Sequence, residues 1–308
     1  MRTVCLINNY NYGQYLKDCV ESVFSQTVPF DEVILVDDGS TDNSLELLEP
    51  FQNFHPHFRV ITKKNEGQMS CFNAVTDLID ERSQVFFLDS DDFYPIDYLQ
   101  NTLAQMGSVT WDIAFSMLIP FEAKKKRPPI SLTQDQDFFQ SLFTGPFAPP
   151  SLAHLKGLEP FSFPSTSAIT RMHRSWVGMP TSSISILGSL FKQITPFLGA
   201  DLKHAYVDDI FVLGSSILGV EKHFLTNNGV YYRIHQKNMS RTGTDSKGVD
   251  RLAILNQIIS HFCIKFGLPR HPSIEEFLFE THNFNLLQKE LINLTLPVEC
   301  QIDTTSNL

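Results

Sequence analysis

The sequence contains one tetrapeptide rich enough in carboxylates to bind a metal ion, Asp89-Ser90-Asp91-Asp92. Three carboxylates this close repel one another, so the arrangement costs stability unless a cation offsets the charge. Oxygen-only ligands suit Mg²⁺ or Mn²⁺, which also keep coordination positions open for substrate phosphates. A metal that joins the carboxylates to a diphosphate would make the diphosphate a better leaving group. The alternative is a solvated acidic turn that caps a helix, and the tetrapeptide alone does not decide between them.

A second acidic segment, Asp37-Asp38-Gly39-Ser40, also allows two interpretations. One is a strand-to-helix turn, in which the glycine supplies a positive φ and the serine caps the helix. The other is a binding site in which a carboxylate accepts a hydrogen bond from a base or a ribose. The segment alone favours neither.

Both segments follow short apolar runs that predict buried strands. Such runs occupy residues 4–7, 33–36, 59–62 and 85–88, and apolar positions at helical spacing separate them. This alternation predicts a parallel sheet with helices on both faces. Ligands of such sheets bind beyond the carboxyl ends of the strands, and three of these four runs end in Asn or Asp clusters. The position of the acidic tetrapeptide therefore favours a site over a turn.

Composition limits the classes of partner and compartment. The 308-residue chain has a net charge of −10, which argues against nucleic acid as the main partner because phosphate backbones need basic surface. Five scattered cysteines without a C-x-x-C pair argue against a disulfide framework and a structural zinc site. The N-terminal apolar run is too short for a signal peptide, and no run approaches the roughly 20 residues of a membrane helix. We expect a cytoplasmic protein.

Five elements together resemble the nucleotide-binding half of family 2 glycosyltransferases, which have the GT-A fold. In order, they are Asn8-Asn9-Tyr10-Asn11, the S-x-x-x-Q-T of residues 22–27, the D-D-G-S-T-D of residues 37–42, an N-x-G element with Asn65, Gly67, Cys71 and Asn73, and the D-x-D-D of residues 89–92. Order and spacing agree with the family pattern over residues 3–100. Each element alone is unspecific, whereas the joint match is specific.

The resemblance implies a role for each matching residue. The nucleotide would be bound by Asn8 and Asp38 at the base, with Tyr10 near it, and by Asp89 at the ribose. Asp91 would ligate the metal, Mn²⁺ or Mg²⁺, and Asp92 would support it. One departure is Phe72, where many family members have Arg. Lys64 is then the candidate that replaces a phosphate-side or ribose-side contact.

The second half of the chain matches the family less closely. The family's catalytic base is an Asp at the start of a helix, and Val207-Asp208-Asp209 is the candidate here. The spacing to Gly219 favours Asp208, and Asp209 remains open. The structural alternative is a pair of acidic residues favoured by the helix dipole.

A further segment near the end of this half, Tyr232-Arg233-Ile234-His235, resembles the family's Y-R-x-H stretch. The resemblance places His235 near the metal and the diphosphate, with Arg233 as a basic residue beside the diphosphate. The alternative for the histidine is a purely structural role.

We therefore predict an α/β protein of the GT-A fold, a mostly parallel, Rossmann-like sheet flanked by helices. Residues 1–110 form the nucleotide-sugar-binding half, residues 111–240 the acceptor-binding and catalytic half of the same domain, and residues 241–308 a helical extension. The expected activity is an inverting, hexosyltransferase-type transfer from a nucleotide-diphosphate sugar, with UDP-sugar favoured. The acceptor would be a hydroxyl of a saccharide or a lipid-linked molecule, in polysaccharide, lipopolysaccharide or glycoconjugate synthesis.

Two other functional classes remain open, and so does contact with a membrane surface. A catalytically inactive nucleotide-sugar-binding protein would share every binding residue. A nucleotidyltransferase should have a Gly-rich, Arg-containing phosphate loop after the first strand, and this chain has none there. The basic run at residues 124–127 predicts a solvated loop, which could also attract an anionic membrane surface and allow peripheral contact at its inner face.

Overall fold

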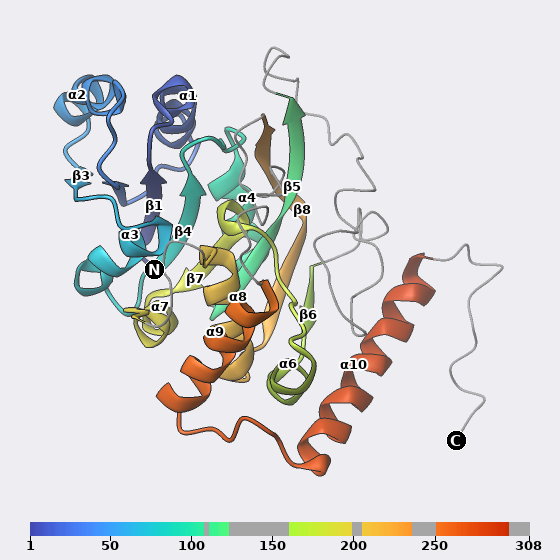
Figure 1. Ribbon diagram of the computed structural model, residues 1–308. Helices are drawn as coiled ribbons and strands as arrows, with labels where there is room; N and C mark the ends of the chain where they lie inside the picture. The colour runs from blue at the N-terminus through green and yellow to red at the C-terminus, as the bar shows by residue number, and fades with distance from the viewer. Residues whose placement is uncertain (108–110, 123–159, 199–204, 236–250, 296–308) are drawn as a thin grey trace.

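A computed structural model describes residues 1–107, 111–122, 160–198, 205–235 and 251–295. Within them the chain forms one eight-stranded sheet in the order β3-β2-β1-β4-β7-β5-β8-β6. The strands are β1 (Thr3–Asn9), β2 (Glu32–Asp37), β3 (Phe58–Thr62), β4 (Gln84–Asp89), β5 (Ile113–Glu122), β6 (Phe161–Phe163), β7 (Ile184–Leu187) and β8 (Lys222–Ile234). Strands from both expected halves thus share a single sheet (Figure 1).

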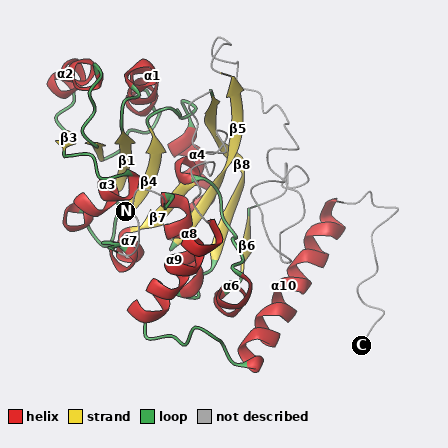
Figure 2. Ribbon diagram, viewed as in Figure 1, coloured by secondary structure: helices red, strands yellow, loops and turns green. Residues whose placement is uncertain are grey.

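Helices lie on both faces of this sheet (Figure 2). They are α1 (Gly13–Phe24), α2 (Ser44–Phe54), α3 (Gln68–Ala74), α4 (Tyr98–Met106), α6 (Ser167–His173), α7 (Gly188–Ile194), α8 (Val207–Ile217), α9 (Arg251–Lys265) and α10 (Ile274–Thr295), with short 3₁₀ turns η1 (Thr76–Leu78) and η3 (Thr181–Ser183). All six residues of β2 are buried, which explains the continuous apolar run at its residues 33–36. The parallel sheet predicted for the first half is confirmed by β1 to β4.

The direction of the strands determines where the second half contributes to the site. β7 is antiparallel to both β4 and β5, and β5 is parallel to β8. β5 and β8 therefore run in the same direction as β1, β2 and β4, and the carboxyl ends of all five lie at one edge of the sheet (Figure 1). The residues that follow β4 and those that end β8 meet there.

The two C-terminal helices attach to different parts of the domain. α9 packs against α8, and α10 packs against α6. Glu280 of α10 accepts hydrogen bonds from the backbone amides of Ala168 and Ile169 at 2.7 and 3.1 Å, so it caps the N-terminus of α6. No helix within the described ranges is long and apolar enough to cross a membrane. The basic run at residues 124–127 lies outside the described residues.

Candidate functional site

The acidic tetrapeptide follows β4 directly, and its carboxylates converge. One side-chain oxygen from each of Asp89, Asp91 and Asp92 lies within 4.8 Å of the other two. The backbone amide of Asp92 donates to the carbonyl of Asp89 at 2.9 Å, which closes a tight turn after the strand. Phe93 then pairs with Tyr231 of β8, so the turn is held at both of its ends.

Asp92 is directed into the protein. Its two oxygens accept hydrogen bonds from the Arg233 backbone amide at 2.8 Å and from the Ser182 hydroxyl at 2.6 Å. The same Ser182 oxygen accepts a hydrogen bond from the Asp89 amide at 3.0 Å. Asp92 therefore connects the tetrapeptide to η3 and β8, as a supporting residue would.

Asp91 faces the basic residues at the end of β8. Its Oδ2 lies 2.9 Å from Nε2 of His235, and its carbonyl accepts a hydrogen bond from Nε of Arg233 at 2.8 Å. The guanidinium of Arg233 also reaches Asp18 at 2.9 Å and lies over the ring of Tyr15. The structure thus brings the predicted pair Arg233 and His235 to the metal-binding candidate.

The electrostatics of the cluster fit a divalent cation. The pKa of Asp89 is raised to about 8. Burial of the carboxylate is the largest cause, and repulsion from Asp91 is the second. Burial likewise raises the pKa of Asp92, and the charges of Asp91 and Asp89 raise it further. A bound cation would favour the charged forms of these carboxylates. The oxygen donors suit Mn²⁺ or Mg²⁺, so the residues fit such an ion.

The second acidic segment organises the loop after β3. Asp38 is buried, and its carboxylate accepts hydrogen bonds from Nζ of Lys63 at 2.8 Å, from the Gly67 amide at 2.9 Å and from the Ser70 hydroxyl at 3.2 Å. Gly39 has a φ of +74°, and a Cβ there would lie 2.9 Å from the backbone nitrogen of Asn65. The close approach of these two loops therefore requires glycine.

The remaining nucleotide-binding candidates differ in their surroundings. The Asn8 side-chain oxygen is buried and has no hydrogen-bond partner within the described part of the chain. Tyr10 is 45% exposed, and Lys64 is also exposed. Asp89 accepts a hydrogen bond from Nε2 of Gln68 at 2.7 Å. An unsatisfied buried acceptor is costly, so Asn8 is suited to receive a donor from a ligand.

Phe72 lies in the core. Its ring is fully buried and packs against Phe87 of β4 and Phe211 of α8, with centroids 4.8 and 5.7 Å away. The position where many family members have Arg is therefore used here to join α3 to the sheet and to α8.

The two candidate bases occupy the first turn of α8 in different environments. Asp208 is half-buried, and its charge contributes to the raised pKa of Asp89. Asp209 is 2% exposed and pairs with Arg251 of α9 at 2.5 Å. Burial raises the pKa of both residues, and Arg251 opposes the shift in both. Asp208 is thus the less buried carboxylate of the pair.

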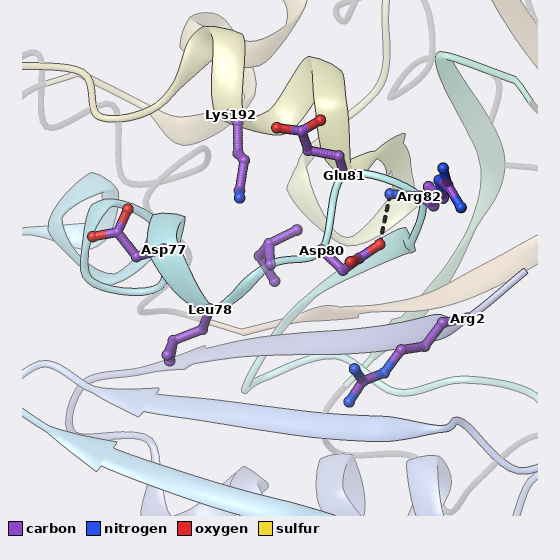
Figure 3. Close-up of a pocket in the computed structure, with 8 residues that line it drawn as sticks. Arg2, Asp77, Leu78, Asp80, Glu81, Arg82 and Lys192 are labelled. Carbon is purple, nitrogen blue, oxygen red and sulfur yellow. Dashed lines mark hydrogen bonds between the residues drawn. The ribbon is translucent and has the colours of Figure 1, made fainter.

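A separate cavity lies at the opposite edge of the sheet (Figure 3). Its volume is about 540 Å³, and its lining comes from the starts of β1 and β4, the segment before β4, and α7. Basic and acidic side chains line it together, namely Arg2, Arg82 and Lys192 with Asp77, Asp80 and Glu81. It includes none of the predicted site residues.

Comparison with known proteins identifies the family of the N-terminal part of the chain. Residues 5–141 match the sequence model of Glycosyl transferase family 2. These residues form a glycosyltransferase family 2 domain. The matched segment contains the acidic tetrapeptide and every predicted nucleotide-binding residue, and the candidate base and the β8 residues lie beyond it.

Relatives of this glycosyltransferase cover different lengths of it. The uncharacterised glycosyltransferase alr2836 of Nostoc sp. is 28% identical over 274 residues, which span 87% of this chain and 77% of that protein. The chondroitin synthase of Escherichia coli is 40% identical over 91 residues, which span 30% of this chain and 13% of that protein. The chain therefore matches only a small part of the larger synthase.

Solved structures share the fold of the glycosyltransferase. S. aureus TarS 1-349 in complex with UDP-GlcNAc has a TM-score of 0.54 at 18% identity, covering 96% of this chain and 82% of that one. The mannosyltransferase PcManGT from Pyrobaculum calidifontis, in complex with GDP-Man and Mn²⁺, has a TM-score of 0.55 at 14% identity, covering 96% and 72%. The GT-A fold expected from the sequence is confirmed.

Three polar residues at this site were not predicted from the sequence. Lys63 contacts Asp38, Gln68 contacts Asp89, and Ser182 joins Asp89 to Asp92. Lys63 and Gln68 flank the N-x-G element, so their proximity to a motif could have identified them. Ser182 lies about 90 residues from its partners in a segment without a motif, and no sequence signal points to it.

Proposed function

We propose that the protein transfers a sugar from a nucleotide-diphosphate donor to an acceptor hydroxyl, with inversion at the anomeric carbon, and that Asp208 is the base. The observation that supports this most strongly is the convergence of Asp89, Asp91 and Asp92, from each of which one oxygen lies within 4.8 Å of the other two, and the charge of Asp208 acts on Asp89 of this cluster. A base must lie within reach of the acceptor hydroxyl while the diphosphate leaves from the opposite face of the sugar. Asp209, paired with Arg251 in the interior, is less suited to this role.

Asp91 and His235, with Asp89 beside them, would hold Mn²⁺ or Mg²⁺. The ion, when bound, would neutralise charge that develops on the departing diphosphate. Arg233 would add positive charge near that diphosphate, and its contacts with Asp18 and Tyr15 fix its side chain. Asp92 would keep the tetrapeptide in place through Ser182 and the Arg233 amide.

The nucleoside would occupy the ends of β1 and β2. The unsatisfied Asn8 oxygen can accept a hydrogen bond from the base, and Asp89 can accept one from the ribose. Asp38 would act at the base beside Lys63, with exposed Tyr10 and Lys64 available at the rim. UDP-sugars are the favoured donors, and the TarS complexes with UDP and UDP-GlcNAc support this choice.

The acceptor would be a saccharide or a lipid-linked molecule, and the product a polysaccharide, a lipopolysaccharide or another glycoconjugate. The named relatives include a chondroitin synthase and a minor teichoic acid biosynthesis protein, which supports this range. Within the acceptor-binding half predicted at residues 111–240, residues 123–159 lie outside the described residues.

A panel of nucleotide sugars tests the activity. Nucleoside diphosphate release is measured with Mn²⁺, with Mg²⁺ and with EDTA, each with and without saccharide acceptors. We expect release from at least one UDP-sugar, and only with a divalent ion. For the donor that reacts, proton NMR of the first product should show the anomeric configuration opposite to that of the donor. Retention would contradict the proposed inversion.

A further inference from the structure

The first residue of α9, Arg251, reaches the start of α8. Its Nη2 lies 2.5 Å from Oδ2 of Asp209, and its guanidinium lies over the ring of Tyr206, 4.5 Å from the centroid. Asp209 is 2% exposed, whereas the Arg251 side chain is 33% exposed. The C-terminal extension thus supplies the cation for a carboxylate buried next to the proposed base.

Among the residues that the structure describes, few charges act on this ion pair. Asp208 lies on the same turn of α8, and its Oδ1 accepts the backbone amide of Asp209 at 3.0 Å. The charge of Asp208 acts on Asp89 at the end of β4, and the charge of Arg251 acts on both carboxylates of α8. Trp176, on the segment after α6, lies beside Asp209. Arg251 is the cation acting on the two adjacent carboxylates among the residues that the structure describes.

We propose that Arg251 is a positioning residue for catalysis: it holds Asp209 in the interior, and thereby leaves Asp208 as the carboxylate that takes the acceptor's proton. The inference rests on the proposed role of Asp208 as the base. It also gives the helical extension a part in the reaction, because Arg251 is the first residue of α9.

The physical reason is the cost of a buried carboxylate without a partner. Without Arg251, Asp209 would either take up a proton or draw water and other polar groups towards itself. Asp208 would also lose a favourable charge, so a larger fraction of it would be protonated at acidic pH. Protonated Asp208 cannot act as a base, so the reaction would slow most at low pH.

The test compares pH profiles of the full-length enzyme and Arg251→Met, with the donor identified in the panel. We expect kcat to fall by roughly tenfold or more at pH 6 and by less than threefold at pH 9, while KM for the donor stays within about twofold. Arg251→Lys keeps the positive charge and should recover most of the activity at pH 6. A uniform loss across the pH range, or no loss, would overturn the proposal.

Arg270→Met is the matched control. Arg270 also anchors the C-terminal extension, through Asn256 at 3.1 Å and the backbone carbonyl of Arg171, but contacts neither acidic residue of α8. We expect this variant to lower the unfolding temperature without changing the shape of the pH profile. If Arg270→Met shifts the profile as Arg251→Met does, general loosening of the extension explains both, and the proposal is wrong.

A stability measurement separates this inference from the proposed activity. Thermal unfolding of Arg251→Met, Asp209→Asn and the double variant forms a cycle that requires no substrate. We expect the double variant to be clearly more stable than the sum of the single effects allows, since removing both partners leaves no buried charge unpaired. Additive effects would show that the pair does not hold Asp209, whatever the enzyme transfers.

Discussion

The three carboxylates of the acidic tetrapeptide have different surroundings. Asp92 is engaged by Ser182 and the Arg233 amide, Asp91 faces His235, and Asp89 accepts a hydrogen bond from Gln68. The sequence motif predicts three similar ligands on chemical grounds, and the resemblance to the family separates their roles. The contacts give that separation a physical basis, because an oxygen already bonded inward is less available to an ion.

Substitution of these carboxylates should therefore give unequal effects. Asp91→Ala should remove detectable Mn²⁺-dependent UDP binding, because the carboxylate that faces His235 is lost. Asp92→Ala should weaken that binding by roughly 10–100-fold, the usual range for a residue that orients a ligand. Isothermal titration with UDP in the presence of Mn²⁺ measures both. Equal losses in folded variants would contradict the different roles.

The raised pKa of Asp89 predicts a pH-dependent stability of the metal-free protein. This group has a pKa of about 8 in the folded state, against an ordinary value of 3.8. The folded state therefore holds a proton that the unfolded state releases, and stability should fall as pH rises from about 4 to about 8. Unfolding temperatures in EDTA should follow this course.

Two controls identify the source of that pH dependence. Stabilisation by Mn²⁺ should increase over the same pH range, because the ion replaces the proton. Asp89→Asn should flatten the decline, because its amide does not titrate. An unfolding temperature that is independent of pH in EDTA would show that folding does not raise the pKa of Asp89.

Helix α3 and helix α8 are joined through Phe72, and this contact explains a departure from the family pattern. The phenylalanine packs on Phe87 and Phe211 in the core, whereas a family arginine at this place would need a charged partner. The sequence shows that the residue differs from the family pattern. It does not show which way the side chain points, because that depends on α8, more than 130 residues away.

Substitution of Phe72 should affect stability and not the donor. Phe72→Leu keeps an apolar side chain and should cost about 1 kcal/mol. Phe72→Arg buries a charge without a partner and should cost about 3–5 kcal/mol. Denaturant unfolding measures both, and UDP affinity of Phe72→Leu should equal that of the wild type. A large loss of UDP affinity in that variant would place Phe72 in the donor site.

The elements of the first half could be predicted because each has a local signature. The runs ending at Ile7, Val36 and Leu88 are continuous and apolar because β1, β2 and β4 are covered on both faces. In the second half, β7 is only four residues long, and β5 lies in a segment where no strand was expected. Their pairing depends on distant partners, which local patterns do not record.

Across the whole molecule, the C-terminal helices connect elements that the sheet alone does not join. α9 brings Arg251 to α8, and α10 brings Glu280 to α6. From the sequence, only the helical character of this region could be predicted, because its partners are buried in the fold and carry no motif.

Loss of the α6 cap should destabilise the entire domain. Glu280→Ala leaves the amides of Ala168 and Ile169 without their acceptor, which should cost about 1–3 kcal/mol. Glu275→Ala on the same helix is the control, because Glu275 is exposed and its loss should change stability by no more than about 0.5 kcal/mol. Denaturant unfolding gives the free energy of unfolding of each variant for comparison. Similar values would show that α10 does not secure α6.

Assignment of the base to Asp208 is tested most directly by comparing two asparagine variants in the sugar-transfer reaction. With the donor, acceptor and Mn²⁺ held constant, Asp208→Asn should lower kcat by roughly 10²–10⁴-fold, the usual contribution of a general base. Asp209→Asn should keep kcat within about tenfold, because its carboxylate pairs with Arg251 and does not take the proton. An unchanged kcat in Asp208→Asn, or a greater loss in Asp209→Asn, would contradict this assignment.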